Sequence, residues 1–128
     1  MDLALEIATP ERLLVREQVT EVQIPGRAGY FGVLPGHAPL LSELANGVLT
    51  YVAQGRSRVL AILGGFVEVL PDRVRVLADA ARRKEEIDGA AAKQDLDKAQ
   101  AALPTAPDPD AALAEVARAQ ALVDAAAA

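Results

Sequence analysis

The sequence predicts a mainly β protein with an α-helical tail. We expect a flattened N-terminal β-sandwich or barrel of about 8–10 short strands, followed by an antiparallel two-helix hairpin. Up to about residue 80, short apolar runs recur between turn residues. From about residue 82, Gly and Pro become rare, and Ala, the strongest helix former, dominates two segments. We therefore divide the chain into a sandwich domain, residues 1–84, and a hairpin domain, residues 85–128.

The β half is identified by period-2 alternation and by turn signals. Leu3, Leu5 and Ile7 alternate with more polar residues, and later runs do the same. Two turn sequences separate the later strands, namely Gln54-Gly55-Arg56-Ser57 and Leu70-Pro71-Asp72-Arg73. The expected strands include residues 3–7, 20–24, 48–53, 58–63, 67–69 and 74–76.

The α half contains two expected helices, residues 84–103 and 109–128. The junction, Leu103 to Asp110, holds three prolines, which end one helix and begin the next. Asp108 suits an N-cap and Pro109 the first helical position. The spacing predicts one apolar face on the second helix, formed by Leu113, Val116, Ala117 and Val123. Because the contact faces are mostly Ala, the hairpin buries little apolar area, and we expect it to move or to dock on another surface.

Composition excludes several classes of function. The chain has no Cys and one His, so neither a disulfide framework nor a His/Cys metal site can form. The net charge of −5 comes from residues 84–128, which hold nine acidic and four basic residues. An acidic, aromatic-poor protein is a poor nucleic-acid binder. No apolar stretch approaches the roughly 20 residues that span a bilayer, and the alternating N-terminal pattern leads us to expect no signal peptide. We expect no direct membrane insertion.

The sequence also argues against catalysis, and we assign no catalytic residue and no metal ligand. A Ser-His-Asp arrangement would have to combine His37 with Ser42 or Ser57. His37 lies in a turn-rich segment, which favours a histidine that holds the loop or contacts a partner. The glycines of residues 26–36 match the spacing of neither phosphate-binding motif and indicate tight turns instead.

The Gly-rich segment does predict a binding surface. Arg27 and Tyr30 lie at its expected tip, next to Phe31. A cation and an aromatic side chain on an exposed loop are typical of protein-binding surfaces. Together with His37, these three residues are our candidate partner-binding residues.

Two sequence blocks in this order resemble one family. Gly32-Val-Leu-Pro-Gly-His-Ala-Pro-Leu-Leu41 is followed by Gly64-Gly-Phe-Val-Glu-Val69. Val74-Arg-Val-Leu-Ala-Asp79 and Ile87-Asp88 continue the match, which covers nearly the full length. The chain thus resembles the epsilon subunit of F-type ATP synthases, of the bacterial type.

The resemblance implies a non-catalytic rotor subunit of the central stalk. The sandwich would link the gamma subunit to the ring of membrane-embedded rotor subunits and so couple proton translocation to ATP synthesis. The segment from Arg27 to His37 would lie near the ring. The hairpin would contact the alpha/beta hexamer transiently. The protein would lie at the cytoplasmic face of the bacterial plasma membrane as a peripheral subunit.

Two departures from the family concern the hairpin. Some bacterial members bind ATP through Ile/Leu-Asp-x-x-Arg-Ala, and here Ile87 and Asp88 match, as does Ala92, but Ala91 replaces the Arg. Since Ala supplies neither charge nor a bidentate fork, we expect no cofactor.

Inhibitory hairpins carry a basic second helix, whereas residues 108–128 have Arg118 as their one base. We expect weak inhibition of ATP hydrolysis.

A different class of function remains as the alternative. The chain could be a free-standing β-sandwich adaptor or ligand-binding module, with the hairpin as an oligomerisation arm. That alternative predicts a stable homo-oligomer without a membrane partner, and fold alone does not separate the two hypotheses.

Overall fold

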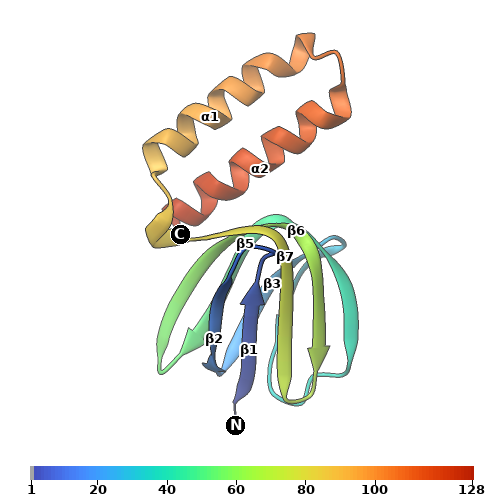
Figure 1. The fold of residues 1–128 in the computed structure, drawn as a ribbon, viewed down its shortest axis with the longest axis vertical. Helices are drawn as coiled ribbons and strands as arrows, with labels where there is room; N and C mark the ends of the chain where they lie inside the picture. Colours follow the sequence, from blue (N-terminus) through green and yellow to red (C-terminus); the bar gives the residue numbers. More distant parts are fainter. Residues whose placement is uncertain (1) are drawn as a thin grey trace.

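A β-sandwich carries a two-helix hairpin at one end (Figure 1). The computed structural model describes residues 2–128. The strands are β1 (Leu3–Ala8), β2 (Leu13–Val19), β3 (Glu21–Gly26), β4 (Gly29–Val33), β5 (Leu40–Ala53), β6 (Arg56–Leu70) and β7 (Arg73–Arg83). The helical elements are η1 (Lys84–Glu86), α1 (Gly89–Ala102), η2 (Leu103–Thr105) and α2 (Pro109–Ala127), where η marks a short 3₁₀ turn.

The strands form one hydrogen-bonded sheet in the order β2-β1-β7-β6-β5-β3-β4, which folds over on itself. Neighbouring strands are antiparallel except β1 and β7, which pair in parallel. The expected sandwich is confirmed, but the expected 8–10 short strands are wrong, because the described residues form seven. The count is lower because β5, β6 and β7 are long, with 14, 15 and 11 residues.

A shift in side-chain phase lets these long strands belong to both layers. In β6 the core positions are even-numbered up to Ile62 and odd-numbered from Val67 onward. In β5 and β7 the core positions also switch between even and odd numbers, opposite the same part of β6. The strand pairing there leaves out Ala45, Gly64 and Asp79. Because a one-residue slip turns each later side chain to the opposite face, the bend keeps both halves of each strand facing the core.

Gly65 makes this bend possible. Its φ of +117° lies in a region that side chains rarely allow. A Cβ at this position would lie 2.8 Å from the Ala78 Cα and would also overlap the Leu77 carbonyl oxygen. The close approach of β7 to β6 at the bend therefore requires a residue without a side chain.

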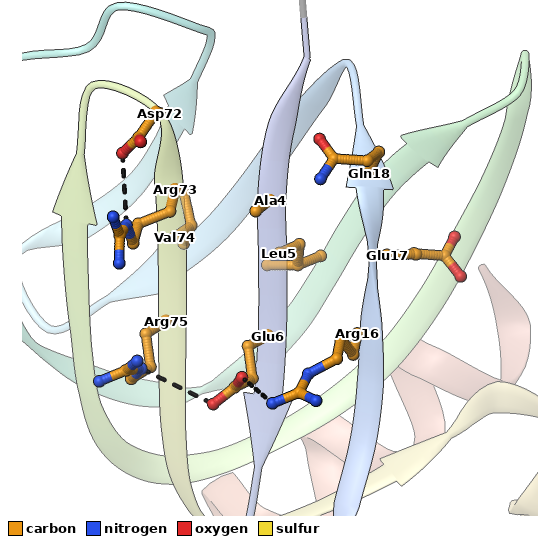
Figure 2. A pocket seen from close by; sticks show the side chains of 10 residues that line it. All are labelled: Ala4, Leu5, Glu6, Arg16, Glu17, Gln18, Asp72, Arg73, Val74 and Arg75. Atoms are coloured by element: carbon orange, nitrogen blue, oxygen red, sulfur yellow. Dashed lines mark hydrogen bonds and ion pairs between the residues drawn. The ribbon is translucent and has the colours of Figure 1, made fainter.

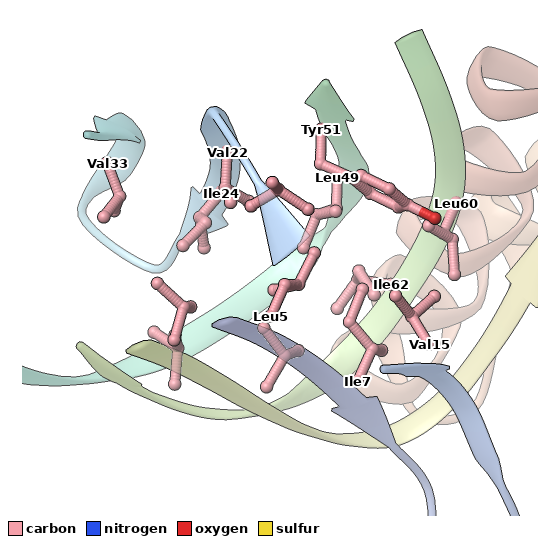
Figure 3. Close-up of a cluster of buried hydrophobic side chains, with 14 of the residues drawn as sticks. Leu5, Ile7, Val15, Val22, Ile24, Val33, Leu49, Tyr51, Leu60 and Ile62 are labelled. Carbon is pink, nitrogen blue, oxygen red and sulfur yellow. The ribbon is translucent and has the colours of Figure 1, made fainter. Parts of the chain in front are cut away.

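The core is aliphatic, as the composition predicts. Leu5, Ile24 and Ile62 are at most 1% exposed, and Tyr51 is the one buried aromatic residue in the described part of the chain (Figure 3). Residues 2–128 contain no buried charged or polar side chain. The sandwich is therefore held by burial of branched side chains from both layers.

The helical hairpin forms as predicted, with one altered boundary. Asp108 caps α2 by accepting from the Ala111 N–H at 3.2 Å, and Pro109 is the first helical residue. The first helix begins at Gly89 rather than at residue 84. The reason is that β7 continues to Arg83 and η1 follows, while Asp88 accepts from the first helical N–H groups.

The hairpin is folded back, and α2 packs on β5 and β6. Two faces of α2 are buried. Ala119 and Ala126 share the α1 side, since Ala126 lies against Gly89. Ala121 and Ala125, one turn apart, share the opposite side and are at most 3% exposed. This side is the one that remains for the contact of α2 with β5 and β6, and in β6 Ala61 and Leu63 are buried outside the main core.

The apolar face predicted for the second helix is wrong at two positions. Leu113 and Ala117 are both exposed, Leu113 at 53%. The stripe toward α1 passes through Ala112 and Val116 instead, which are half-buried. Because the two helices approach each other closely, the small Ala112 side chain lies between them near the hairpin tip and the larger Leu113 side chain does not.

The bend predicts the effect of two glycine substitutions. We expect Gly65→Ala to destabilise the protein by about 2–4 kcal/mol, because it adds both a steric overlap and a strained φ. Gly89→Ala is the matched control, since its Cβ would make an ordinary 3.6 Å contact at the start of α1. It should leave stability unchanged or slightly raised. Urea unfolding followed by circular dichroism measures both, and equal stabilities would contradict the proposed role of Gly65.

Candidate functional site

The β3–β4 hairpin presents the first two predicted residues. Gly26 pairs with Gly29, so Arg27 and Ala28 form a two-residue turn at its tip. The Arg27 guanidinium is 76% exposed and forms an ion pair with Glu43 of β5. This pair raises the pKa of Arg27, chiefly through the hydrogen bond that the guanidinium donates to Glu43. Arg27 thus remains charged and accessible at one end of the molecule.

Tyr30 combines exposure with a structural role. Its ring is 62% exposed, yet its hydroxyl accepts a hydrogen bond from the Val48 N–H at 2.9 Å. The β3–β5 ladder is irregular between Gln23 and Gly26, beside this N–H. The Tyr30 hydroxyl therefore gives the Val48 N–H an acceptor that the irregular β3–β5 pairing does not provide. Gly47 allows the close approach, because a Cβ there would lie 2.7 Å from the hydroxyl.

The other two predicted residues lie elsewhere. Phe31 is half-buried and packs against the core. His37 belongs to the loop after β4, where its Nδ1 lies 2.7 Å from the Ala38 carbonyl. That loop is tied to the β6–β7 turn by the Gly36 N–H, which donates to the Pro71 carbonyl at 2.8 Å. The structure therefore brings Arg27 and Tyr30 together and places His37 at the opposite end of β4.

Sequence reasoning missed an exposed apolar patch on the outer face of the sheet. Phe66 and Leu77 are direct cross-strand partners and are 53% and 52% exposed. Leu41, on the neighbouring strand, is 73% exposed. We call these three residues the outer patch. On its other side Phe66 pairs with Glu43 of β5, which forms the ion pair with Arg27. The outer patch therefore adjoins the Arg27 ion pair. Strand alternation after the phase shift at Gly65 could have indicated Phe66 from the sequence.

An ion-pair network, drawn in Figure 2, lies next to the outer patch, because its Arg75 is two residues from Leu77 on β7. The Glu6 carboxylate on β1 lies between two arginines, 3.2 Å from Arg16 on β2 and 3.6 Å from Arg75 on β7. The surrounding surface forms a hollow of about 540 Å³ across these three strands. An apolar centre with a charged rim is the usual composition of a protein-binding surface.

The four residues of the degenerate nucleotide motif lie at the start of α1. The Asp88 carboxylate accepts from the N–H groups of Ala90 and Ala91, both at 3.1 Å. Asp88 therefore acts as the N-cap of the helix. Ala91 is exposed, Ala92 is buried and Ile87 is half-buried.

Residues 2–128 contain no group of three or more His, Cys, Asp or Glu residues that could hold a metal ion. No helix among them is long and apolar enough to cross a membrane.

Comparison with known proteins identifies the family. The family model "ATP synthase, Delta/Epsilon chain, beta-sandwich domain" matches residues 2–84. The chain is 59% identical to the ATP synthase epsilon chain of Solibacter usitatus, over 93% of this chain and 91% of that one. It is 49% identical to that of Koribacter versatilis, over 78% and 70% of the two chains. The chain belongs to the ATP synthase epsilon-chain family. It is accordingly a non-catalytic, accessory subunit of the central stalk.

A solved structure of the Euglena gracilis mitochondrial ATP synthase, described as OSCP/F1/c-ring in rotational state 1, supports the same conclusion. One of its chains matches with a TM-score of 0.84 and 26% identity, over 97% of this chain and 81% of that chain. A central-stalk/c-ring structure from Tetrahymena thermophila shares the fold, with a TM-score of 0.65 and 12% identity. The sandwich-plus-hairpin arrangement is therefore shared with central-stalk subunits.

The Tyr30 hydroxyl generates a prediction. Tyr30→Phe keeps the ring over Gly47 but removes the acceptor for the Val48 N–H, so we expect a loss of about 0.5–1.5 kcal/mol in stability. Amide exchange of Val48 should accelerate, while that of Leu49 in the same strand serves as the control. Unchanged exchange at Val48 would show that the hydroxyl has no structural role.

Proposed function

We propose that this chain couples proton translocation to ATP synthesis by joining the gamma subunit to the membrane rotor ring. The observation that carries the proposal is the outer patch, a row of exposed apolar side chains on an otherwise charged sheet face. Residues 1–84 would hold both docking surfaces, and residues 85–128 would be regulatory. The membership of the family and the stalk-containing relatives support this assignment.

We assign the two surfaces to different partners. The outer patch and its rim would bind gamma, because a broad apolar sheet face suits a stable protein interface. Arg27 and Tyr30 would contact the ring, since a narrow hairpin tip suits contact with loops at a membrane surface. This placement would put the protein at the cytoplasmic face of a bacterial plasma membrane, attached through the ring.

The alternative, a free-standing adaptor, is not favoured. It would need an interface for self-association, and the outer patch could in principle serve. The family relationship favours a partner within a larger complex instead.

The outer patch predicts a loss of gamma binding on substitution. Phe66→Asp should weaken association at least about tenfold, because a carboxylate in the centre of the interface would be desolvated without a partner. Leu113→Asp is the matched control, because Leu113 is equally exposed, at 53%, but lies on the hairpin.

The measurement is co-purification with a tagged gamma subunit, followed by titration of the purified pair. Equal affinity for the parent and for Phe66→Asp would remove the outer patch from the gamma interface. A homo-oligomer that forms without gamma and is lost in Phe66→Asp would support the adaptor alternative.

We also propose that the hairpin binds ATP weakly or not at all. Asp88 already directs its carboxylate to two helical N–H groups, and Ala91 replaces the phosphate-binding arginine. Isothermal calorimetry should detect no binding tighter than about 1 mM. Ala91→Arg should raise the affinity, whereas Ala90→Arg, one position away, should not. Submillimolar binding by the unaltered chain would contradict the proposal.

The charge of α2 supports a weak inhibitory role. The helix offers one base, Arg118, beside Asp110, Glu115 and Asp124. An acidic partner segment would repel it. Deleting residues 88–128, which keeps Glu86 in place, should therefore raise ATP hydrolysis by the assembled complex less than about twofold. A large increase would show that this hairpin is a strong inhibitor despite its charge.

A further inference from the structure

The sandwich is open along one side, between β2 and the start of β6. β2 is an edge strand and pairs only with β1. The pairing of β6 with β7 begins at Leu60 and Arg83, so residues 56–59 of β6 have a strand partner only in β5. A hollow of about 420 Å³ lies between these two edges. The openings of β-barrels are common places for small-molecule sites, which usually have volumes of roughly 300–1,000 Å³.

Charged side chains occupy core-facing positions at this opening. Glu17 is two residues after the core residue Val15 of β2. Arg58 is two residues before the core residue Leu60 of β6, and Arg83 is the cross-strand partner of Leu60. Because side chains alternate between the two faces of a strand, all three lie on the core side, and all three line the hollow. Departures from the apolar pattern of a strand are expected where a site is built.

Tyr51, a core residue of β5, also lines the hollow. The residue is 5% exposed, and Figure 3 shows its hydroxyl directed toward Leu60. The hydroxyl forms no hydrogen bond among residues 2–128, where no fully buried polar side-chain atom lacks a partner, so it reaches the open space of the hollow. Burial raises the pKa of Tyr51, which keeps the hydroxyl protonated at neutral pH. Since a buried tyrosine hydroxyl usually has a partner, this donor is available for a ligand.

The charged groups of the hollow have both signs and lie on facing walls. Glu17 belongs to the β2 wall and Arg58 to the β6 wall, and among residues 2–128 neither forms an ion pair. The two side chains are therefore too far apart to bond each other directly. The Arg83 guanidinium donates to the Leu14 carbonyl and keeps further N–H groups. Glu85 completes the rim, so that two arginines face two glutamates.

Two nearby carboxylates do not alter this balance. Glu86 accepts two hydrogen bonds of 2.9 Å from Arg12 and one of 2.9 Å from the Arg83 N–H. These bonds, chiefly those of the Arg12 side chain, lower the pKa of Glu86 to about 2, so this pair is closed. Arg16, the remaining charged residue of the hollow, lies 3.2 Å from Glu6. The charges left for a ligand are therefore equal in number and opposite in sign.

We propose that this hollow binds a small zwitterion, namely an α-amino acid with an apolar side chain. The ligand carboxylate accepts from the Tyr51 hydroxyl and from the Arg58 guanidinium, and the ligand ammonium group donates to Glu17. The apolar side chain of the ligand lies against Leu14 and Leu60, which are at most 5% exposed. A ligand with one charge would leave the group on the opposite wall desolvated without a partner. The site is independent of the docking surfaces proposed above.

Three probes of similar size test the charge requirement on the full chain. L-Phenylalanine carries both charges, 3-phenylpropionate only the carboxylate, and 2-phenylethylamine only the ammonium group. We expect L-phenylalanine to bind with a Kd of about 5 mM or tighter, and at least about fivefold more tightly than either of the other two. Shifts of the Leu14 and Leu60 methyl signals in an NMR titration locate the bound probe.

Substitutions within the hollow separate binding from folding. Tyr51→Phe keeps the ring and removes a hydroxyl that has no partner in the chain, so stability in urea should be unchanged while the affinity for L-phenylalanine falls about threefold or more. Arg58→Gln and Glu17→Gln should each weaken binding about tenfold. Arg56→Gln is the matched control, because Arg56 is an exposed arginine of the same strand outside this hollow. It should keep the affinity within about twofold of the parent.

Three outcomes would overturn the proposal. No shift of the Leu14 and Leu60 methyl signals with any probe at about 20 mM would show that the hollow is not a site for such ligands. Equal or tighter binding of 3-phenylpropionate or 2-phenylethylamine would show that a zwitterion is not preferred. Unchanged affinity for L-phenylalanine in Tyr51→Phe and Arg58→Gln would place the bound probe elsewhere on the chain.

Discussion

The close approach of β6 and β7 at Gly65 is the constraint on which the rest of the structure depends. Here the backbone of β7 occupies the space that a side chain at position 65 would fill. Opposite this point, the core residues of β5, β6 and β7 all switch between even and odd positions. Without that change, the second half of each strand would turn its apolar residues outward. The bend thus determines both the closed core and the identity of the residues that remain outside.

The outer patch is a consequence of the same bend. Phe66 follows the bend directly, and Leu77 is its cross-strand partner, so both lie on the outer face beside the Glu6 network. Among the described residues, the core takes in Tyr51 fully and Phe31 partly, so Phe66 is left for the outer face. Core and binding surface therefore use alternate positions of the same strands.

The hairpin follows a different physical rule. Its helices are built from Ala, which favours helix formation and close packing but buries little area against the sandwich. Its position depends on directional contacts at the junction, where Arg12 reaches 74 residues along the chain to Glu86. A fold with a strong core and a lightly docked appendage can keep its binding surfaces constant while the appendage moves.

Local patterns in the sequence determined the two-part architecture, the turns and the helix caps. Alternation predicted strands, Asp108 and Pro109 predicted the start of α2, and the ordered glycine-rich blocks indicated the family. These features depend on neighbours within a few residues, which a sequence displays directly.

Tertiary structure alone decided the number of strands, the joining of β3, β4 and β5 through Tyr30, and the pairing of Arg12 with Glu86. It also separated Arg27 from His37 and brought Phe66 beside Leu77. Each of these depends on which distant strands become neighbours and in which register. That choice is made by packing of the whole core, so no local pattern encodes it.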